Sequence, residues 1–225
     1  MTFIIAEIGS SPAPIWNLPG WCEAARVVGA DAIKCQLFLS EHFPKSEQAS
    51  KRKLEFPRER FVEFVRCGRG QGLAAGASVF DTEAARLASL GDFIKLAARE
   101  QFNHALMARV YDLNFTGPIY RSVSDLNAIH RITFGNETTL WTVQQYPISL
   151  GRALFEVVRA AYLFKQRDMR WGWSSHSRYI ADCVWAVRLG ASVIEKHLAI
   201  ASTDAEAGHS LLPFEFSRMV KRIRQ

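Results

Sequence analysis

Short apolar segments alternate with helix-like stretches along almost the whole chain, and this alternation restricts the possible folds more than any other feature. Segments with strand character are Phe3–Gly9, Ala32–Phe38, Leu73–Phe80, Phe93–Ala98, Pro118–Val123, Thr138–Gln145, Arg170–His176 and Val193–Ile200. Helix-like stretches follow them, at Gly20–Val28, Arg58–Cys67, Thr82–Leu90, Asn103–Leu113, Asp125–Ile132, Gly151–Phe164, Tyr179–Ala191 and Pro213–Arg224. Strands separated by helices pair in parallel, so the pattern predicts one α/β domain over residues 1–225, a closed (β/α)8 TIM barrel.

A doubly wound open sheet is the alternative fold for an alternating chain. Such a sheet usually carries a glycine-rich phosphate turn after its first strand, and the segment Gly9-Ser-Ser-Pro-Ala-Pro14 has no such pattern. The residues Ser40–Pro57 are predicted to form a polar loop. Basic residues gather in and just after it, at Lys45, Lys51, Arg52, Lys53, Arg58 and Arg60.

Composition indicates a soluble, cytoplasmic protein. No apolar run approaches the roughly 20 residues that span a bilayer, and the N-terminal segment lacks the basic region of a signal peptide. The four cysteines form no CxxC pair, so neither a disulfide framework nor a zinc knuckle is expected. The net charge of +6 suits a small anionic substrate. Nucleic-acid binding is not expected, because no base-reading motif accompanies the basic residues.

Two histidines end neighbouring predicted strands. His176 closes Trp171-Gly-Trp-Ser-Ser-His176, and His197 closes Val193-Ile-Glu-Lys-His197. In a parallel barrel both imidazoles would lie on the rim that carries catalysis. Two neutral imidazoles can hold a divalent metal and leave positions open for a substrate. The alternative is that each histidine is a structural residue.

Charged residues inside other apolar strands predict an anion site on the same rim. Lys34 and Lys95 lie in the second and fourth strands, where a lysine is costly unless it meets an anion. Glu7 ends the first strand and is expected to orient a substrate or to act as an acid or base. The alternative for all three is a Lys–Glu network inside the barrel that also uses Glu195.

Neutral polar side chains at other strand ends are expected to orient a substrate by hydrogen bonds. They are Gln36, Ser122, Gln144, Tyr146 and Ser174. His209 lies in the loop after the eighth strand and is also close enough in sequence to reach the rim.

Taken together and in this order, the motifs resemble those of the sialic acid synthase family, the N-acetylneuraminate synthase-like barrels. The matching segments are Ile4-Ile-Ala-Glu-Ile-Gly9, Gly29-Ala-Asp-Ala-Ile-Lys-Cys-Gln36, Ser78-Val-Phe-Asp81, Ile94-Lys95, Gln145-Tyr-Pro147, Gly172-Trp-Ser-Ser-His176, Leu189-Gly-Ala-Ser-Val-Ile-Glu-Lys-His197 and Ser210-Leu-Leu-Pro213. The resemblance implies a transferase of sialic acid and polysaccharide biosynthesis, which condenses phosphoenolpyruvate with an N-acetylated amino sugar and releases phosphate.

The resemblance also implies roles for individual residues. His176 and His197 match the metal ligands, normally of Mn2+, with Mg2+ as the other candidate. Phosphoenolpyruvate contacts match Lys34, Lys95, Ser122 and Ser174. Residues around the sugar and the reacting carbons match Glu7, Glu100 and Tyr146. The implied metal polarises the sugar aldehyde, C3 of phosphoenolpyruvate attacks it, and water adds at C2 before phosphate leaves.

Several positions depart from the family pattern. Ser10–Pro14 replaces an Asn-His pair and a glycine, Ser175 replaces an acidic neighbour of the metal ligand, and Gln144 replaces an asparagine. Arg99 stands in the segment after the fourth strand and is expected to take over a lost phosphate contact. The last-loop sugar ligand of the family has three candidate counterparts, which are Asp204, Glu206 and His209.

The family's C-terminal antifreeze-like domain has no counterpart in these 225 residues, so a barrel-only member is expected. A separate cap protein and a homo-oligomer are the expected protein partners. Two other hypotheses stay open from the sequence. One is a catalytically degenerate barrel that binds a sugar acid or a protein, and the other is a different metal-dependent aldolase or lyase.

Overall fold

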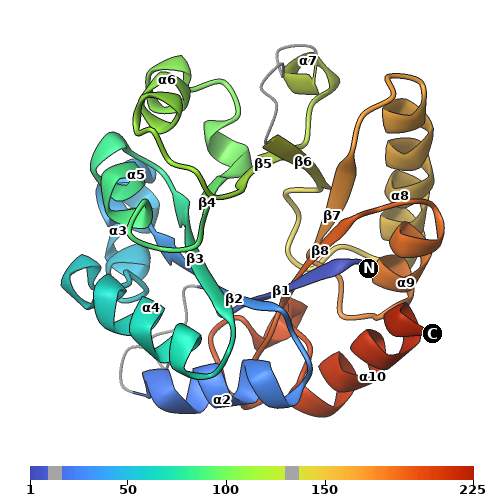
Figure 1. Cartoon of the computed structure of the whole chain (residues 1–225), viewed down its shortest axis with the longest axis horizontal. Coiled ribbons are helices and arrows are strands. Elements are labelled where there is room, and N and C mark those ends of the chain that lie inside the picture. The colour runs from blue at the N-terminus through green and yellow to red at the C-terminus, as the bar shows by residue number, and fades with distance from the viewer. Residues whose placement is uncertain (10–16, 130–136) are drawn as a thin grey trace.

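The computed structural model describes residues 1–9, 17–129 and 137–225, and its eight strands close into one barrel in sequence order (Figure 1). The strands are β1 (Phe3–Glu7), β2 (Ala32–Leu37), β3 (Ala74–Val79), β4 (Phe93–Leu96), β5 (Ile119–Val123), β6 (Glu137–Thr142), β7 (Trp171–Ser175) and β8 (Val193–His197). Every neighbouring pair is parallel, and β1 closes the ring against β8. The TIM-barrel prediction is confirmed, and the open sheet is wrong.

Helices surround the strands (Figure 1). They are α2 (Leu18–Val27), α3 (Lys45–Arg52), α4 (Phe61–Gly70), α5 (Thr82–Ala88), α6 (His104–Asp112), α7 (Leu126–Ile129), α8 (Leu150–Lys165), α9 (Ala181–Arg188) and α10 (Pro213–Arg224). Short 3-10 turns are η1 (Ser40–His42), η2 (Arg58–Arg60), η3 (Ala98–Glu100) and η4 (Ala207–His209). The predicted turn segment Ser10–Pro14 and the end of the predicted helix Asp125–Ile132 lie outside the described residues.

The loop prediction for Ser40–Pro57 is wrong, because α3 lies within it. Its sequence, KSEQASKR, contains mostly good helix formers, and Pro44 stands just before its first residue. None of its residues is buried. A helix without an apolar face gives no hydrophobic period, which is why the pattern did not reveal it.

Two apolar layers hold the barrel together. The larger one fills the space between the outer faces of the strands and the helices, with Trp21, Phe64, Trp141 and Phe164 among its fully buried side chains. The smaller one closes the inside of the barrel at the N-terminal ends of the strands. Its members are Ile5, Ala32, Phe93, Tyr120, Leu140 and Val193. Any site inside the barrel must therefore lie above this layer, towards the C-terminal ends of the strands.

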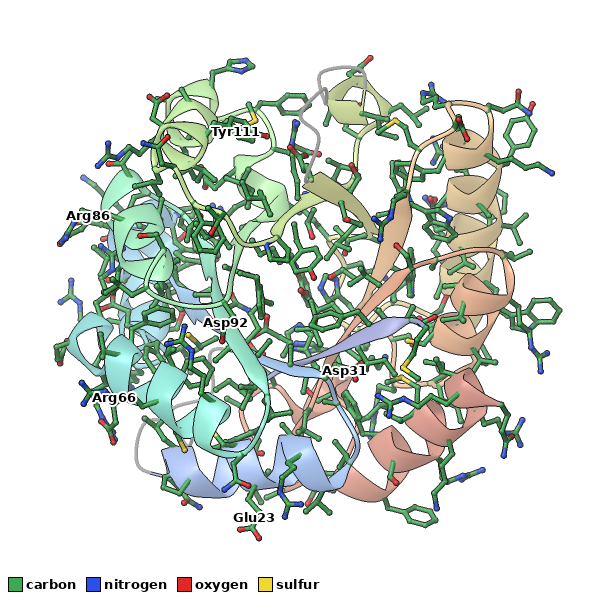
Figure 2. All side chains as sticks on the ribbon, in the orientation of Figure 1. Glu23, Asp31, Arg66, Arg86, Asp92 and Tyr111 are labelled. Atoms are coloured by element: carbon green, nitrogen blue, oxygen red, sulfur yellow. The ribbon has the colours of Figure 1, made fainter. Side chains whose placement is uncertain are left out.

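Charged residues at the N-terminal rim stabilise neighbouring strands. Asp31 accepts a hydrogen bond from the backbone N–H of Ile4 at 2.8 Å, and Asp92 accepts one from the N–H of Ala75 at 2.8 Å. Figure 2 shows both carboxylates close to the ring of strands, whereas other labelled side chains point outward from the helices, namely Glu23, Arg66 and Arg86. Within the described ranges, no helix combines the length and the apolar character needed to cross a membrane.

Candidate active site

A cavity of about 690 Å³ opens above the apolar layer, at the C-terminal ends of the strands. Side chains alternate along a strand, so Lys34 and Gln36 on β2 share the inner face, as do Glu195 and His197 on β8. Of the residues predicted for the site, the cavity is lined by Glu7, Lys34, Gln36, Lys95, Arg99, Ser122, Gln144, Tyr146, Ser174, His176 and His197. The sequence-predicted rim residues therefore lie in one place.

Two lysines and two glutamates form the floor of this cavity. The ammonium of Lys34 contacts the carboxylate of Glu7 directly and lies 3.7 Å from Glu195. Lys95 lies 2.5 Å from the other oxygen of Glu195. All four side chains are at most 7% exposed. The Lys–Glu network predicted as the alternative is thus present, and it lines the same cavity as the other candidate residues.

The network changes the acidity of its members. Burial alone would raise the pKa of Glu195, but Lys34 and Lys95 outweigh it and hold this pKa well below its ordinary value. Burial lowers the pKa of Lys34 to about 7, and the neighbouring Glu195 only partly opposes this. Glu195 therefore stays ionised between the two lysines.

Hydroxyl groups extend the network up the wall of the cavity. Ser78 lies 2.6 Å from the ammonium of Lys34, and the hydroxyl of Ser174 donates to Glu195 at 2.9 Å. The hydroxyl of Ser122 is fully buried and has no hydrogen-bond partner in the part of the chain that the structure describes. A buried polar group without a partner is costly. Ser122 is therefore a hydrogen-bond donor available to a ligand.

The two predicted histidines lie side by side above this floor, with ring centroids 5.4 Å apart. Nδ1 of His176 lies 2.7 Å from the carbonyl oxygen of Val143, and Nδ1 of His197 lies 3.0 Å from the carboxylate of Glu206. A carbonyl or an ionised carboxylate can only accept, so both Nδ1 atoms carry hydrogen. This tautomer leaves Nε2 of each ring with the lone pair that a metal requires.

Both imidazoles are neutral at physiological pH. Burial, together with the neighbouring His197, holds the pKa of His176 well below its ordinary value. Burial lowers the pKa of His197 to about 4 in spite of the opposing carboxylate of Glu206. Neutral, oriented imidazoles with a carbonyl or carboxylate behind them are typical of metal-binding histidines. The residues present therefore fit a divalent metal.

The loop after β8 adds two side chains to the site. The sequence left three candidates open in this loop and did not choose between them. Glu206 and His209 line the cavity, whereas the carboxylate of Asp204 accepts hydrogen bonds from the backbone N–H groups of Ile200 and Ala201 at 2.8 and 3.0 Å. Asp204 thus fixes the shape of the loop. No hydrophobic period marks this loop, so only the position of each residue after the strand could have suggested a role.

A cationic wall stands on the opposite side, where α3 and the segment before it meet β4. The guanidinium of Arg99 lies 4.2 Å from the ring centre of Phe43, and the ammonium of Lys51 lies 4.9 Å from the same ring. All three side chains line the cavity. The predicted basic segment is therefore divided, since Lys51 faces the cavity while Arg58 and Arg60 pair with nearby carboxylates on the outside.

Glu100, like the candidate Asp204, does not line the cavity. The chain turns after β4 into η3, and the carboxylate of Glu100 accepts a hydrogen bond from the side chain of Asn103 at 2.8 Å. Asn103 caps the N-terminus of α6, so Glu100 helps to hold the start of this helix. Gln144 lines the cavity, and its amide donates to the hydroxyl of Ser124 at 2.8 Å.

A carboxylate supports β7 even though Ser175 is not acidic. Asp182, fully buried at the start of α9, accepts hydrogen bonds from Ser175 at 2.6 Å, Ser177 at 2.9 Å and the indole of Trp173 at 2.9 Å. Lys196, also fully buried, donates to Ser175 at 2.8 Å. These bonds fix the chain on both sides of His176. A buried carboxylate from the following helix thus lies next to Ser175.

The chain is a (β/α)8 protein with an enzyme-like site. Its closed parallel barrel brings buried lysines, carboxylates and a histidine pair together at the C-terminal rim. Comparison with known proteins specifies the class further. Residues 21–225 match the NeuB family, and the chain belongs to that family.

Relatives and solved structures agree with this assignment. The chain is 26% identical to human N-acetylneuraminate-9-phosphate synthase, over 99% of this chain and 69% of that protein. The spore coat polysaccharide biosynthesis protein spsE of Bacillus subtilis is 27% identical, with a TM-score of 0.82 over 99% of this chain and 67% of that one. The N-acetylneuraminic acid synthetase of Leptospira borgpetersenii has the same fold, with a TM-score of 0.90 at 22% identity over 99% and 82% of the two chains.

Proposed function

We propose that this protein condenses phosphoenolpyruvate with an N-acetylated amino sugar, or a related aldehyde, and forms a nonulosonic acid with release of phosphate. The observation that carries the proposal is the meeting of two buried lysines and two oriented, neutral histidines in one cavity of a NeuB-family barrel. The lysines suit a phosphorylated carboxylic acid, and the histidines suit a metal.

The anion is expected to bind between the lysines and the free hydroxyl of Ser122. An incoming carboxylate and phosphate would compete with Glu195 for Lys34 and Lys95, and Ser122 would gain the partner that it lacks in the described chain. Arg99 extends the positive charge towards the mouth of the cavity. These contacts would hold C3 of phosphoenolpyruvate in a fixed direction towards the histidine pair.

The acceptor sugar is expected to bind on the histidine side. Tyr146 lies against His176, with ring centroids 4.1 Å apart, and forms one wall. His176 and His197 would hold the divalent ion, Mn2+ by family resemblance, and a bound ion would supply Lewis-acid chemistry for the sugar aldehyde. Glu7 is the carboxylate expected to accept a proton from the water that adds at C2, because the two lysines hold Glu195 ionised and make it a weak base.

Calorimetry on matched variants tests the two halves of this site. We expect the wild type to bind phosphoenolpyruvate and Mn2+. Lys95→Met is expected to weaken phosphoenolpyruvate binding by about 10- to 100-fold, as loss of one charge-assisted contact of roughly 1.5–3 kcal/mol implies. Lys165→Met, which removes an exposed lysine at the end of α8, is the control and is expected to bind like the wild type.

The double variant His176→Ala/His197→Ala is expected to lose Mn2+ and keep its fold by circular dichroism. If the wild type binds neither ligand, the proposal is wrong. If it binds both but turns over no acceptor in a panel of N-acetylated hexosamines, with and without a phosphate, the barrel is a binding protein or uses another aldehyde.

A further inference from the structure

A third imidazole lies against the histidine pair. The ring centroid of His209 is 4.6 Å from that of His197 and 6.4 Å from that of His176. It comes from η4 in the loop after β8, which is tied to the barrel by the bridge between Leu198 and Leu211. Asp204 further fixes this loop through two backbone hydrogen bonds. His209 is therefore held in place and does not sit on a freely moving segment.

One nitrogen of His209 is left without a partner. Its Nε2 is buried and makes no hydrogen bond to any residue in the described ranges. The carboxylate of Glu206 lies 3.7 Å from this nitrogen, beyond hydrogen-bonding distance, and it already accepts a hydrogen bond from His197. A buried nitrogen beside two other imidazoles is costly unless something binds it.

The donor atoms converge closely enough for a metal. One ligand atom from each of His197, Glu206 and His209 lies within 4.8 Å of the other two, and His176 adjoins this set through its ring, 5.4 Å from that of His197. For metal–nitrogen bonds of about 2.1 Å, a ring centre lies about 3.2 Å from the ion, so two ligand rings have centroids roughly 4.5 to 6.4 Å apart. The three histidines fall within this range, at 4.6, 5.4 and 6.4 Å.

We propose that His209 is a third protein ligand of the metal centre, with Glu206 as the carboxylate that orients His197 and neutralises part of the charge. This inference rests on the metal centre proposed above at His176 and His197, and it adds a ligand that the sequence had left open as a sugar contact. The centre would then present three nitrogens and one adjacent carboxylate, with the remaining positions facing the cavity.

A third nitrogen changes which ion the protein prefers. Mn2+ and Mg2+ favour oxygen ligands, whereas imidazoles favour Zn2+, Co2+ and Fe2+. The proposal therefore predicts that the protein binds Co2+ and Zn2+ far more tightly than Mn2+, and that His209 is responsible for much of this difference. A site of only two histidines and water would show a smaller difference.

The test measures binding of Zn2+, Co2+ and Mn2+ by competition titration, together with the visible spectrum of the Co2+ form. His209→Gln keeps most of the side-chain volume, and His209→Ala removes it, so that a folding defect in one variant does not end the experiment. The control is His104→Ala, because His104 is exposed at the start of α6. Circular dichroism checks the fold of each variant.

We expect both His209 variants to bind Zn2+ and Co2+ about 100-fold or more weakly, beyond the 10- to 100-fold that loss of an outer-shell partner causes. The Co2+ spectrum should change, and His104→Ala should match the wild type. Unchanged affinities and spectra in both His209 variants would overturn the third ligand and leave the two-histidine centre intact. A wild type that binds none of the three ions would overturn both proposals.

Discussion

Replacing Asp182 by alanine is expected to destabilise the barrel more than any change on its surface. This carboxylate is fully buried and accepts three hydrogen bonds, from Trp173, Ser175 and Ser177, at 2.6 to 2.9 Å. The two serines connect it to the buried ammonium of Lys196. Removing the carboxylate would leave the indole N–H without an acceptor and the ammonium without a nearby negative charge.

The expected loss follows from these contacts. Hydrogen bonds to a charged group each contribute about 1.5–3 kcal/mol, but the serines can re-form bonds with Lys196 and recover part of this. Lys196 makes no direct ion pair with Asp182 and is bridged to it by the serines, but it would stay buried without this counter-charge, so the cost approaches that of breaking a buried charge pair, about 3–5 kcal/mol. We expect Asp182→Ala to lose about that much, which is a large share of the roughly 5–15 kcal/mol that stabilises a typical domain.

Urea denaturation followed by circular dichroism measures the loss. Asp182→Asn keeps the shape and one acceptor oxygen, so it should lose less than the alanine variant. Asp112→Ala, at an exposed position at the end of α6, is the control and should stay within about 0.5 kcal/mol of the wild type. A loss below about 1 kcal/mol for Asp182→Ala would refute the reasoning, because it would mean that the buried network contributes little.

Three further changes probe the floor and the rim of the cavity. Glu195→Gln should lower stability at pH 7 by about 3–5 kcal/mol. Because the pKa of Glu195 is depressed in the folded state, the stability difference between the wild type and Glu195→Gln should be full above about pH 4.3 and shrink as the pH falls. A stability difference that does not change with pH in urea titrations would contradict the depressed pKa of Glu195. Gly76→Ala places a Cβ about 2.3 Å from the carbonyl oxygen of Phe93 and about 2.7 Å from its ring, and should cost about 1–3 kcal/mol, seen as a lower melting temperature; an unchanged melting temperature would contradict this packing. Gly9 has a φ of +68° and lies against Glu206, so Gly9→Ala should displace that carboxylate and weaken metal binding in a titration, and wild-type affinity would argue against a role for it.

The barrel could be predicted from sequence because short, largely apolar strands alternate with helices that mostly have an apolar face, and α3 is the exception. The parallel order of the strands also predicted that Lys34, Lys95, His176 and His197 meet at one rim, because parallel strands of a barrel end at the same edge. The alternation of side chains along β8 is a further sequence signal for the site. Glu195 lies two residues before His197 and must share its inner face.

The remaining features depend on contacts that a pattern does not encode. The helix α3 has no buried face, and its role as a cavity wall depends on the meeting of Phe43 and Arg99. The positions of Glu206 and His209 depend on how the loop after β8 folds back. The contact of Asp182 with Ser175 depends on the packing of α9 against β7, which the sequence pattern does not encode.

The central claim is that the cavity condenses phosphoenolpyruvate with an aldehyde sugar, and the most direct test follows a label. Phosphoenolpyruvate carrying ¹⁸O in the oxygen between C2 and phosphorus is incubated with the protein, a divalent metal and a panel of N-acetylated hexosamines. The account predicts ¹⁸O-labelled phosphate, because the carbon–oxygen bond breaks. It also predicts a product with the combined mass of the sugar and the pyruvate unit, and neither should form without the sugar. Unlabelled phosphate, or phosphate released equally without any sugar, would contradict the account.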